Sequence, residues 1–387
     1  MSGADPREPG WAAHQVVQWQ ATHGRHALPW QNTRDPYRVW LSEIMLQQTQ
    51  VAAVIGYYAR FLERFPDVQA LAAASQDDVF AHWAGLGYYS RARNLHACAR
   101  QVVALHGGQF PRTAEALQTL PGIGRSTASA VASFCFAERV AILDGNVKRV
   151  LTRLLGFGAD LAEARNERAL WALATELLPQ TGLDQAMPRY TQGLMDLGAT
   201  VCTARSPACL LCPLQSRCVA SREGRMQDYP VKTRKLKRGR ADWWLLWAED
   251  DQGRIFIARR PPTGIWSGLH CLPVFEDEDA LLAALPAGAR AQVQPLPPFT
   301  HVLTHKDLLL HPVYVQLPRS GLPREGQWLL PEELAGIGLP APVKKLLSPI
   351  SGLAPAPWTL LAWASSSRWR LSVTQLRLKL LASCSTR

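Results

Sequence analysis

The sequence predicts a mainly α-helical region followed by a smaller α/β domain, and three observations support this fold class. Apolar residues recur at the spacing of a helix face over about residues 11–197. Four of the eight cysteines crowd into residues 202–218. From Asp242 the pattern changes to short apolar runs around a glycine-containing turn, which is typical of strands. We therefore expect a helical part over 11–225 and an α/β domain over 241–350.

The first helices are predicted from their capping residues. Asp35 and Pro36 suit the N-cap and first position of a helix, because the carboxylate accepts from free backbone N–H groups and proline needs no donor there. A short break is expected at residues 47–49, with Thr49 capping the next helix. A third helix is expected to end at the turn "GLGYYSRARNL", residues 85–95.

The second half of the chain contains a linker, a hairpin and an unassigned tail. The stretch "VKTRKLKRGR", residues 231–240, is basic at six of ten positions and forms part of a predicted linker over 226–240. The run "WWLLWAEDDQGRIFIARR" predicts a β-hairpin. Residues 351–387 show no sustained period, and no function is assigned to this tail.

Composition favours a polyanionic partner. The formal net charge is +11 and the isoelectric point is about 9.5. The basic excess is moderate, because +6 remains once the five basic residues of the tail 351–387 are set aside. No apolar run approaches the ~20 residues that span a bilayer, and residues 1–10 contain no apolar signal segment. We expect no membrane partner and a cytoplasmic location, associated with the nucleoid if the source is bacterial.

The clustered cysteines predict a metal or cluster site. Their spacing is Cys202-x6-Cys209-x2-Cys212-x5-Cys218, which lets four thiolates close around one centre. Zinc and iron–sulfur are both open at this point. Zinc ribbons usually pair two short knuckles, whereas only one two-residue spacing is present here, so the pattern favours iron–sulfur.

A glycine-containing turn predicts a phosphate grip. A fourth helix is expected to open at Thr113 and to stop at Pro121, and "PGIG", residues 121–124, then leads into another helix. The small residues Gly122 and Gly124 let a phosphate approach the free N–H groups of that helix. An ordinary helix–helix connection is the alternative.

Two carboxyl groups are candidates for acid and base chemistry. Glu43 lies among Trp40, Leu41, Ile44 and Met45, and apolar surroundings raise the pKa of a carboxyl group, so that it can act as an acid. Asp144 follows an apolar run and precedes another helix. A polar-face residue for Glu43 and an N-cap for Asp144 are the structural alternatives.

Taken together, these features resemble one family. The hairpin, the aspartate about twenty residues after it and the cysteine loop are the pattern of the endonuclease III superfamily of DNA glycosylases. The strings "WLSEIMLQQTQV" (40–51), "GLGYYSRARNL" (85–95), "PGIGRSTA" (121–128) and "LDGNVKRVL" (143–151) resemble the MutY-type adenine DNA glycosylases. The likeness covers most of residues 11–225. It implies a helix-hairpin-helix catalytic region with a 4Fe–4S cluster and a Nudix-like C-terminal domain.

The resemblance also implies roles for individual residues. Glu43 would protonate adenine at N7, Asp144 would stabilise the cationic sugar and Asn146 would orient groups beside it. Ser126 occupies the position at which lyases of the superfamily carry a nucleophilic lysine, so a monofunctional glycosylase is expected. The implied partner is duplex DNA with adenine opposite 8-oxoguanine or guanine, bound by a monomer.

Further residues are implied to contact the DNA. Gln48 and Tyr88 would insert around the opposite base, and a core aromatic is the alternative for Tyr88. In the Nudix-like domain, Leu303-Thr304-His305 stands where the family has a lesion-reading Phe-Ser-His, so Thr304 and His305 would read the lesion. A purely structural role on a strand is the alternative for His301 and His305. The stretch "FEDEDALLAAL", residues 275–285, lacks the acidic box of true Nudix enzymes, so no hydrolase activity is expected.

Two other hypotheses remain open from the sequence. One is an endonuclease III-like glycosylase and lyase for oxidised pyrimidines, which Ser126 and the extra domain speak against. The other is a non-catalytic iron–sulfur protein that binds DNA, in which Glu43 and Asp144 serve only as structural polar groups.

Overall fold

The computed structural model describes residues 5–233, 238–322 and 325–348. They form two compact units, the second of which begins at Arg238. No helix within the described ranges is long and apolar enough to cross a membrane. The tail 351–387 and part of the basic stretch lie outside the described residues.

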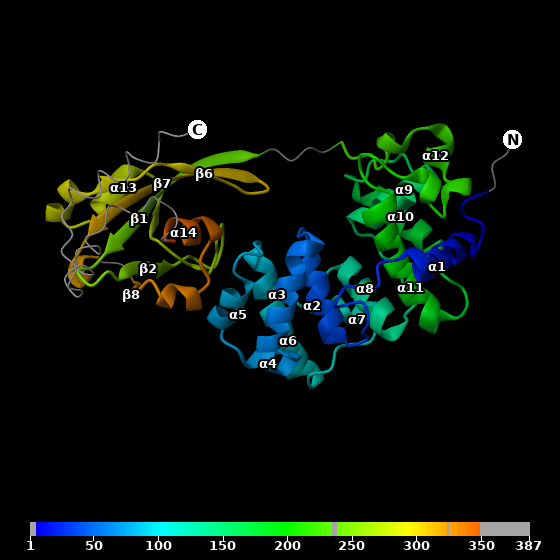
Figure 1. Ribbon diagram of the computed structural model, residues 1–387, viewed down its shortest axis with the longest axis horizontal. Coiled ribbons are helices and arrows are strands. Elements are labelled where there is room, and N and C mark those ends of the chain that lie inside the picture. Colours follow the sequence, from blue (N-terminus) through cyan, green and yellow to red (C-terminus); the bar gives the residue numbers. More distant parts are fainter. Residues whose placement is uncertain (1–4, 234–237, 323–324, 349–387) are drawn as a thin grey trace, which may run out of the picture. The chain divides into compact units, whose positions relative to one another are not determined.

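The first unit is built from α-helices joined by short turns (Figure 1). They are α1 (Trp11–His23), α2 (Pro36–Leu46), α3 (Val51–Arg64), α4 (Val68–Ala73), α5 (Gln76–Trp83), α6 (Tyr89–His106), α7 (Ala114–Leu117), α8 (Arg125–Phe136), α9 (Gly145–Leu155), α10 (Ala164–Glu176), α11 (Leu183–Asp196) and α12 (Val219–Glu223).

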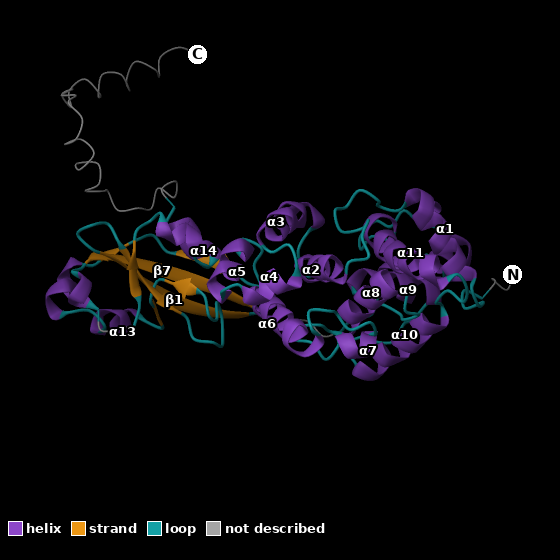
Figure 2. Ribbon diagram, turned by 90° about the horizontal axis from the view of Figure 1, so that it is seen from below, coloured by secondary structure: helices purple, strands orange, loops and turns teal. Residues whose placement is uncertain are grey.

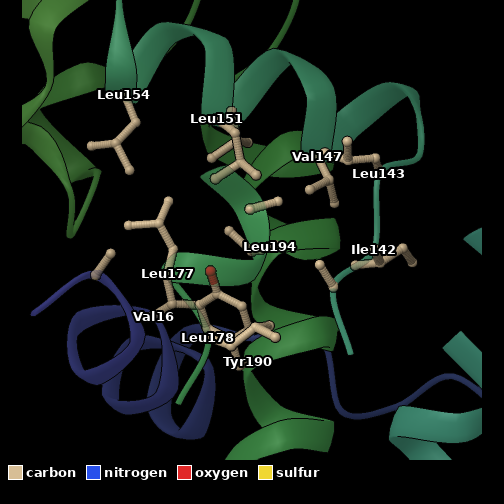
Figure 3. Close-up of a cluster of buried hydrophobic side chains, with 14 of the residues drawn as sticks. Val16, Ile142, Leu143, Val147, Leu151, Leu154, Leu177, Leu178, Tyr190 and Leu194 are labelled. Carbon is tan, nitrogen blue, oxygen red and sulfur yellow. The ribbon is translucent and has the colours of Figure 1, made fainter. Parts of the chain in front are cut away.

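These helices make two groups. In one, α4 and α5 pack on α6, and α2 packs on α3. In the other, α1 packs on α11, and α9 packs on α11 and α12. Helix α8 contacts both α2 and α11 and so joins the groups. The core of the second group is shown in Figure 3, where side chains of α1, α9 and α11 meet.

Helix α9 shows how the core positions a candidate catalytic residue. Val147, Leu151 and Leu154 lie on one face at spacings of four and three residues and are buried in that core (Figure 3). Asp144 is the N-cap and accepts a hydrogen bond from the Val147 N–H at 2.7 Å. The helix ends at Gly156, whose φ of 62° favours glycine. Burial of the apolar face therefore fixes the position of Asp144.

The structure corrects three details of the helix predictions. Gln50, not Thr49, is the N-cap of α3. The helix expected from Thr113 is only the four-residue α7, which Thr113 does cap, and turns follow it. The predicted turn 85–95 is shorter, because α6 already begins at Tyr89. Asp35 and Pro36 begin α2 as predicted, with the Asp35 carboxylate accepting from the Tyr37 N–H.

Helix α11 continues into a single π-helical turn, Leu197–Val201, immediately before the cysteine loop. The Cys202 N–H donates to the Leu197 carbonyl oxygen at 2.6 Å, a bond that spans five residues instead of four. A Cβ atom at Gly198 would lie 2.6 Å from the Asn146 Cβ, so only glycine fits this close approach to α9.

The second unit is a mixed sheet with two short helices, α13 (Glu278–Ala283) and α14 (Ala341–Leu346) (Figure 2). Strands β1 and β7 pair in parallel over eleven residues, and the neighbouring pairs are antiparallel. The predicted hairpin is present as β1 and β2. The strands are β1 (Gly239–Glu249), β2 (Ile255–Arg259), β3 (His270–Cys271), β4 (Val274–Phe275), β5 (Gln294–Pro295), β6 (Phe299–Val302), β7 (Lys306–Gln316) and β8 (Gln327–Leu329). The predicted two-part fold class is confirmed.

Candidate active site

A cavity of the first unit lies among α1, α2, α8 and α11. It has a volume of about 610 Å³ and is also bordered by the segment 24–34, which links α1 to α2. Its walls combine aromatic and aliphatic groups with arginine and amide side chains, and Glu43 is the one carboxyl group among its lining residues. Its lining residues include Arg25, Trp30, Glu43, Leu46 and Gln192.

Glu43 is held at the wall of this cavity by α2. The neighbours Ser42 and Ile44 are buried, and the α2 face that carries Val39 and Leu46 also lines the cavity. Burial, and to a lesser extent the charge of Asp144, raise the pKa of Glu43 to about 8. At neutral pH the carboxyl group is therefore mostly protonated and can donate a proton.

Asp144 stands in a different environment although it also is largely buried. Burial is the largest effect and raises the pKa of its carboxyl group above the ordinary value, while hydrogen bonds from the backbone N–H groups of Val147 and Asn146 oppose that rise. The positive charges of Arg149 and Lys148 lower it as well. These donors and cations favour the ionised form of Asp144 beside a protonated Glu43.

The Asn146 side chain is tied to the cysteine loop. The Arg149 guanidinium donates to Asn146 Oδ1 at 2.9 Å, to the Gly198 carbonyl oxygen at 2.5 Å and to the Cys202 carbonyl oxygen at 2.8 Å. One arginine thus joins the first turn of α9 to the π-helical turn and to the first cysteine of the loop.

The hairpin turn leaves backbone donors free for a phosphate. Gly122 has a φ of 74°, and a Cβ there would lie 2.6 Å from the Asn94 Cβ, so glycine is required. Gly124 is the N-cap of α8 and provides no side-chain cap. Ser126 lies in the first turn of this helix. Phosphate binding by "PGIG" stays a prediction.

Gln48 and Tyr88 share a rare backbone conformation. Their φ angles are 57° and 48°, in the left-handed region that costs a non-glycine residue about 1–3 kcal/mol. Gln48 is exposed and Tyr88 is 43% exposed, so the core-aromatic alternative for Tyr88 is wrong. Both side chains are presented outward by strained turns that the rest of the unit must hold.

The sequence reasoning missed an anchor of the cavity wall. Asp196 is fully buried at the end of α11, where its carboxylate accepts from the Arg25 N–H at 2.9 Å and from Arg25 Nε at 2.7 Å. It also accepts from Gln192 Nε2 at 2.9 Å. Arg25 and Gln192 both line the cavity. In the sequence, Asp196 stands out only by lying six residues before Cys202, and we know of no motif with that spacing.

The four cysteines of the loop lie around one small space, although no group of three or more His, Cys, Asp or Glu side chains among the described residues is arranged to hold a metal ion. Cys202, Cys209, Cys212 and Cys218 all line one small cavity, and each is partly buried. The buried Arg153 donates to the carbonyl oxygens of Thr203 and Ala204 and so braces the loop. Four soft thiol donors around a common space, backed by apolar residues, suit an iron–sulfur cluster.

In the second unit, Thr304 and His305 form the turn between β6 and β7. Both are exposed, and the Leu303 N–H donates to the Lys306 carbonyl oxygen at 2.8 Å to close the turn. His301 lies on β6, where burial lowers the pKa of its imidazole. The turn therefore presents a hydroxyl and an imidazole at the tip of a hairpin.

Comparisons with known proteins agree with this site. The model of the HhH-GPD superfamily of base excision DNA repair proteins matches residues 41–176, and the iron–sulfur binding domain of endonuclease III matches residues 202–218. A NUDIX domain matches residues 243–349. Fold and site together define an iron–sulfur helix-hairpin-helix base excision repair protein. The match to the iron–sulfur binding domain of endonuclease III confirms the prediction of a 4Fe–4S cofactor, and zinc is not supported.

Whole-chain relatives define the family. An adenine DNA glycosylase of Buchnera aphidicola from Acyrthosiphon pisum is 35% identical over 341 residues, which cover 86% of this chain and 95% of that protein. The human adenine DNA glycosylase is 48% identical over 203 residues, covering 50% of this chain and 36% of that protein. The chain belongs to the adenine DNA glycosylase family, as the sequence strings predicted. A solved thermostable thymine-DNA glycosylase is 28% identical with a TM-score of 0.49, covering 56% of this chain and 97% of that one.

Proposed function

We propose that this protein is a monofunctional glycosylase that hydrolyses the N-glycosidic bond of adenine mispaired with 8-oxoguanine or guanine in duplex DNA. One observation carries the proposal. A protonatable glutamate with a pKa of about 8 lines a cavity of about 610 Å³, and a second carboxylate lies close enough to raise that pKa. The cavity is large enough for one nucleobase and its sugar.

Glu43 supplies the proton that makes adenine a leaving group. A base inside a duplex is unreachable, so the adenine must be extruded into the cavity before reaction. There the protonated carboxyl group donates to a ring nitrogen of the base, N7 by analogy with the family, as the bond to the sugar stretches. Trp30 and Leu46 provide apolar contact area for the base and limit the access of water.

Asp144 stabilises the charge that develops on the sugar. Loss of the base leaves an oxocarbenium-like sugar, which an ionised carboxylate favours electrostatically or by a transient bond. Water then completes the hydrolysis. The N-cap hydrogen bond to the Val147 N–H fixes the position of the carboxylate, and Asn146 and Arg149 support the same turn.

The monofunctional assignment rests on the absence of a free amine at the hairpin. Ser126 offers a hydroxyl that cannot form a Schiff base. Lys148, the lysine nearest to Asp144 in sequence, is paired with Glu167 at 2.5 Å. No lysine lines the cavity within the part of the chain that the structure describes.

The remaining predicted residues serve DNA binding. Gly122 and Gly124 expose backbone donors that would hold a phosphate, while Gln48 and Tyr88 would fill the space that the extruded base leaves. Four thiolates, which we assign to Cys202, Cys209, Cys212 and Cys218, would hold the cluster, and the bound cluster supplies a rigid cross-link for a loop that carries Arg205 and Arg217. Thr304 and His305 would contact the opposite base in a monomeric complex.

A single-turnover assay tests the proposal. A duplex with one adenine opposite 8-oxoguanine is incubated with excess cluster-loaded protein and then treated with hot alkali, which breaks the strand wherever a base has been lost. Strand breakage is expected opposite 8-oxoguanine and guanine but not opposite thymine. Breakage without alkali, or a strong borohydride-trapped adduct on oxidised pyrimidine DNA, would instead favour the lyase hypothesis.

A pair of conservative variants separates catalysis from binding. Glu43→Gln keeps the size of the side chain but cannot donate the same proton, so base release should fall below detection while DNA binding persists. Glu63→Gln is the matched control, because Glu63 is exposed on the neighbouring helix α3. Equal and measurable base release by both variants would contradict the role of Glu43, and none by the wild type would leave the non-catalytic hypothesis.

A further inference from the structure

Arg91, which the proposed mechanism does not use, lies at the centre of an unusual set of hydrogen bonds. It is in the first turn of α6 and is only 8% exposed. Its Nη1 atom donates to three carbonyl oxygens at the end of α2, those of Ile44 at 3.0 Å, Met45 at 2.8 Å and Gln47 at 2.6 Å. Arg91 therefore caps the helix that carries Glu43.

The other branch of the same guanidinium reaches two turns. Nη2 donates to Thr49 Oγ1 at 3.1 Å, to the Leu86 carbonyl oxygen at 3.1 Å and to the Gly87 carbonyl oxygen at 3.3 Å. Thr49 thus serves as an acceptor for Arg91 and not as the helix cap predicted from the sequence. One side chain connects the segment after α2 with the segment before α6.

The acceptors of the Arg91 hydrogen bonds flank Gln48 and Tyr88, the two residues with left-handed backbone. Gln48 lies between Gln47 and Thr49, and Tyr88 directly follows Gly87, so Arg91 holds both turns from their neighbouring residues. Its guanidinium also lies 5.3 Å from the centre of the Tyr88 ring. Left-handed backbone at a non-glycine residue persists only where surrounding contacts impose it.

The chemistry of Arg91 argues against a purely stabilising role. None of its six acceptors is a carboxylate, and burial lowers the pKa of the guanidinium to about 10, so the side chain is still charged at neutral pH. A buried charge without an ionic partner is expensive, and an apolar side chain would stabilise a core better. What arginine adds is a planar fork of donors that can fix two separate segments at once.

The turns also border a common cavity. A space of about 220 Å³ is lined by Gln48, Tyr88 and Arg91 together with Pro121 and Gly122 of the hairpin. The residues expected to enter the duplex and the turn expected to grip its backbone thus surround one space.

We propose that Arg91 is a positioning residue for base extrusion, which fixes the turns of Gln48 and Tyr88 to each other and to the end of α2. The inference rests on the proposed function, because extrusion has meaning only if the enzyme acts on a base in a duplex. Arg91 acts through these two turns and does not touch the reacting atoms.

The test compares an adenine that must be extruded with one that is already unstacked. Single-turnover base release is measured for adenine opposite 8-oxoguanine and for adenine in a single-nucleotide bulge. Arg91→Lys keeps the charge but cannot supply both branches of donors. It should slow release of the paired adenine by about tenfold, equivalent to about 1.4 kcal/mol, and release of the bulged adenine by much less. Thr49→Val removes one acceptor with little change in shape, and it should give a smaller defect of the same selectivity.

A fluorescent base reports extrusion without chemistry. In a Glu43→Gln background, 2-aminopurine at the target position should brighten when the protein with Arg91 binds, and should brighten clearly less with Arg91→Lys. Arg100→Lys, at an exposed position of the same helix, is the matched control and should behave as wild type. Cluster absorbance should be unchanged in all variants.

Each outcome decides something. The inference would be overturned if Arg91→Lys slowed release of the paired and the bulged adenine equally and left the 2-aminopurine fluorescence as it is with Arg91. That result would show that Arg91 only supports the folded site. Wild-type rates for Arg91→Lys on both substrates would do the same. If the wild type released no adenine from any duplex, the proposed function would fail by itself, and the 2-aminopurine signal would still decide whether Arg91 controls extrusion.

Discussion

The pKa of Glu43 predicts how base release depends on pH. With a pKa of about 8, the carboxyl group is about 90% protonated at pH 7, about half protonated at pH 8 and about 10% protonated at pH 9. Only the protonated form can donate to the leaving base, so the single-turnover rate should be flat below pH 7 and should fall about tenfold per pH unit above pH 8.

The assay uses saturating enzyme on the duplex with adenine opposite 8-oxoguanine, so that weaker DNA binding at high pH does not enter the rate. The direction of the change is fixed by the structure, because burial and the nearby Asp144 charge both disfavour the ionised glutamate. A rate that already falls with a midpoint near 4.5, the ordinary glutamate value, would refute the reasoning. So would a residual rate in Glu43→Gln that keeps the wild-type pH profile.

Three further predictions follow from the same contacts. Because folding raises the pKa of Glu43, its protonation stabilises the wild type fully below pH 4.5, and this stabilisation is lost as the pH rises to 8. Glu43→Gln lacks the titrating group, so in urea unfolding its free energy of unfolding should rise relative to the wild type by about 1.4 kcal/mol per pH unit between these values. Asp196→Ala leaves the partly buried Arg25 unpaired, so it should destabilise the first unit by about 3 kcal/mol and slow base release. An unchanged midpoint of urea unfolding would contradict the role of Asp196 as an anchor of the cavity wall. Ser126→Lys places an amine in the first turn of α8 and should give a borohydride-trapped adduct with the adenine substrate that wild type does not form; no adduct would show that the amine cannot reach the sugar.

The sequence predicted those parts of the site whose structure depends on residues close to one another along the chain. Asp35 and Pro36 begin α2 because a cap and a first-turn proline need no tertiary partner. The cysteine spacing could be interpreted because four ligands within one loop constrain each other. Glu43 could be singled out because its neighbours Ile44 and Met45 indicated a buried segment.

Long-range contacts explain what the sequence could not predict. Arg91 and the exposed Arg100 are the same residue type on the same helix, and only the tertiary contacts with α2 make one of them a buried clamp. Asp196 meets Arg25 across 171 positions of sequence, so no local pattern marks the pair. The position of Thr49 just before a helix suggests a cap, yet its hydroxyl oxygen accepts a hydrogen bond from Arg91.

The π-helical turn between α11 and the cysteine loop limits how the chain can change its length. A π-helical turn holds one residue more than an α-helical turn, so deleting one residue from Leu197–Val201 would let the segment take α-helical spacing with little change in the direction of the residues that follow. Deleting a residue from the regular part of α11 would instead rotate everything that follows by about 100° around the helix axis and turn Cys202 away from the other three thiols. Single-residue deletions in relatives with a functional cluster should therefore fall in this turn and not within α11.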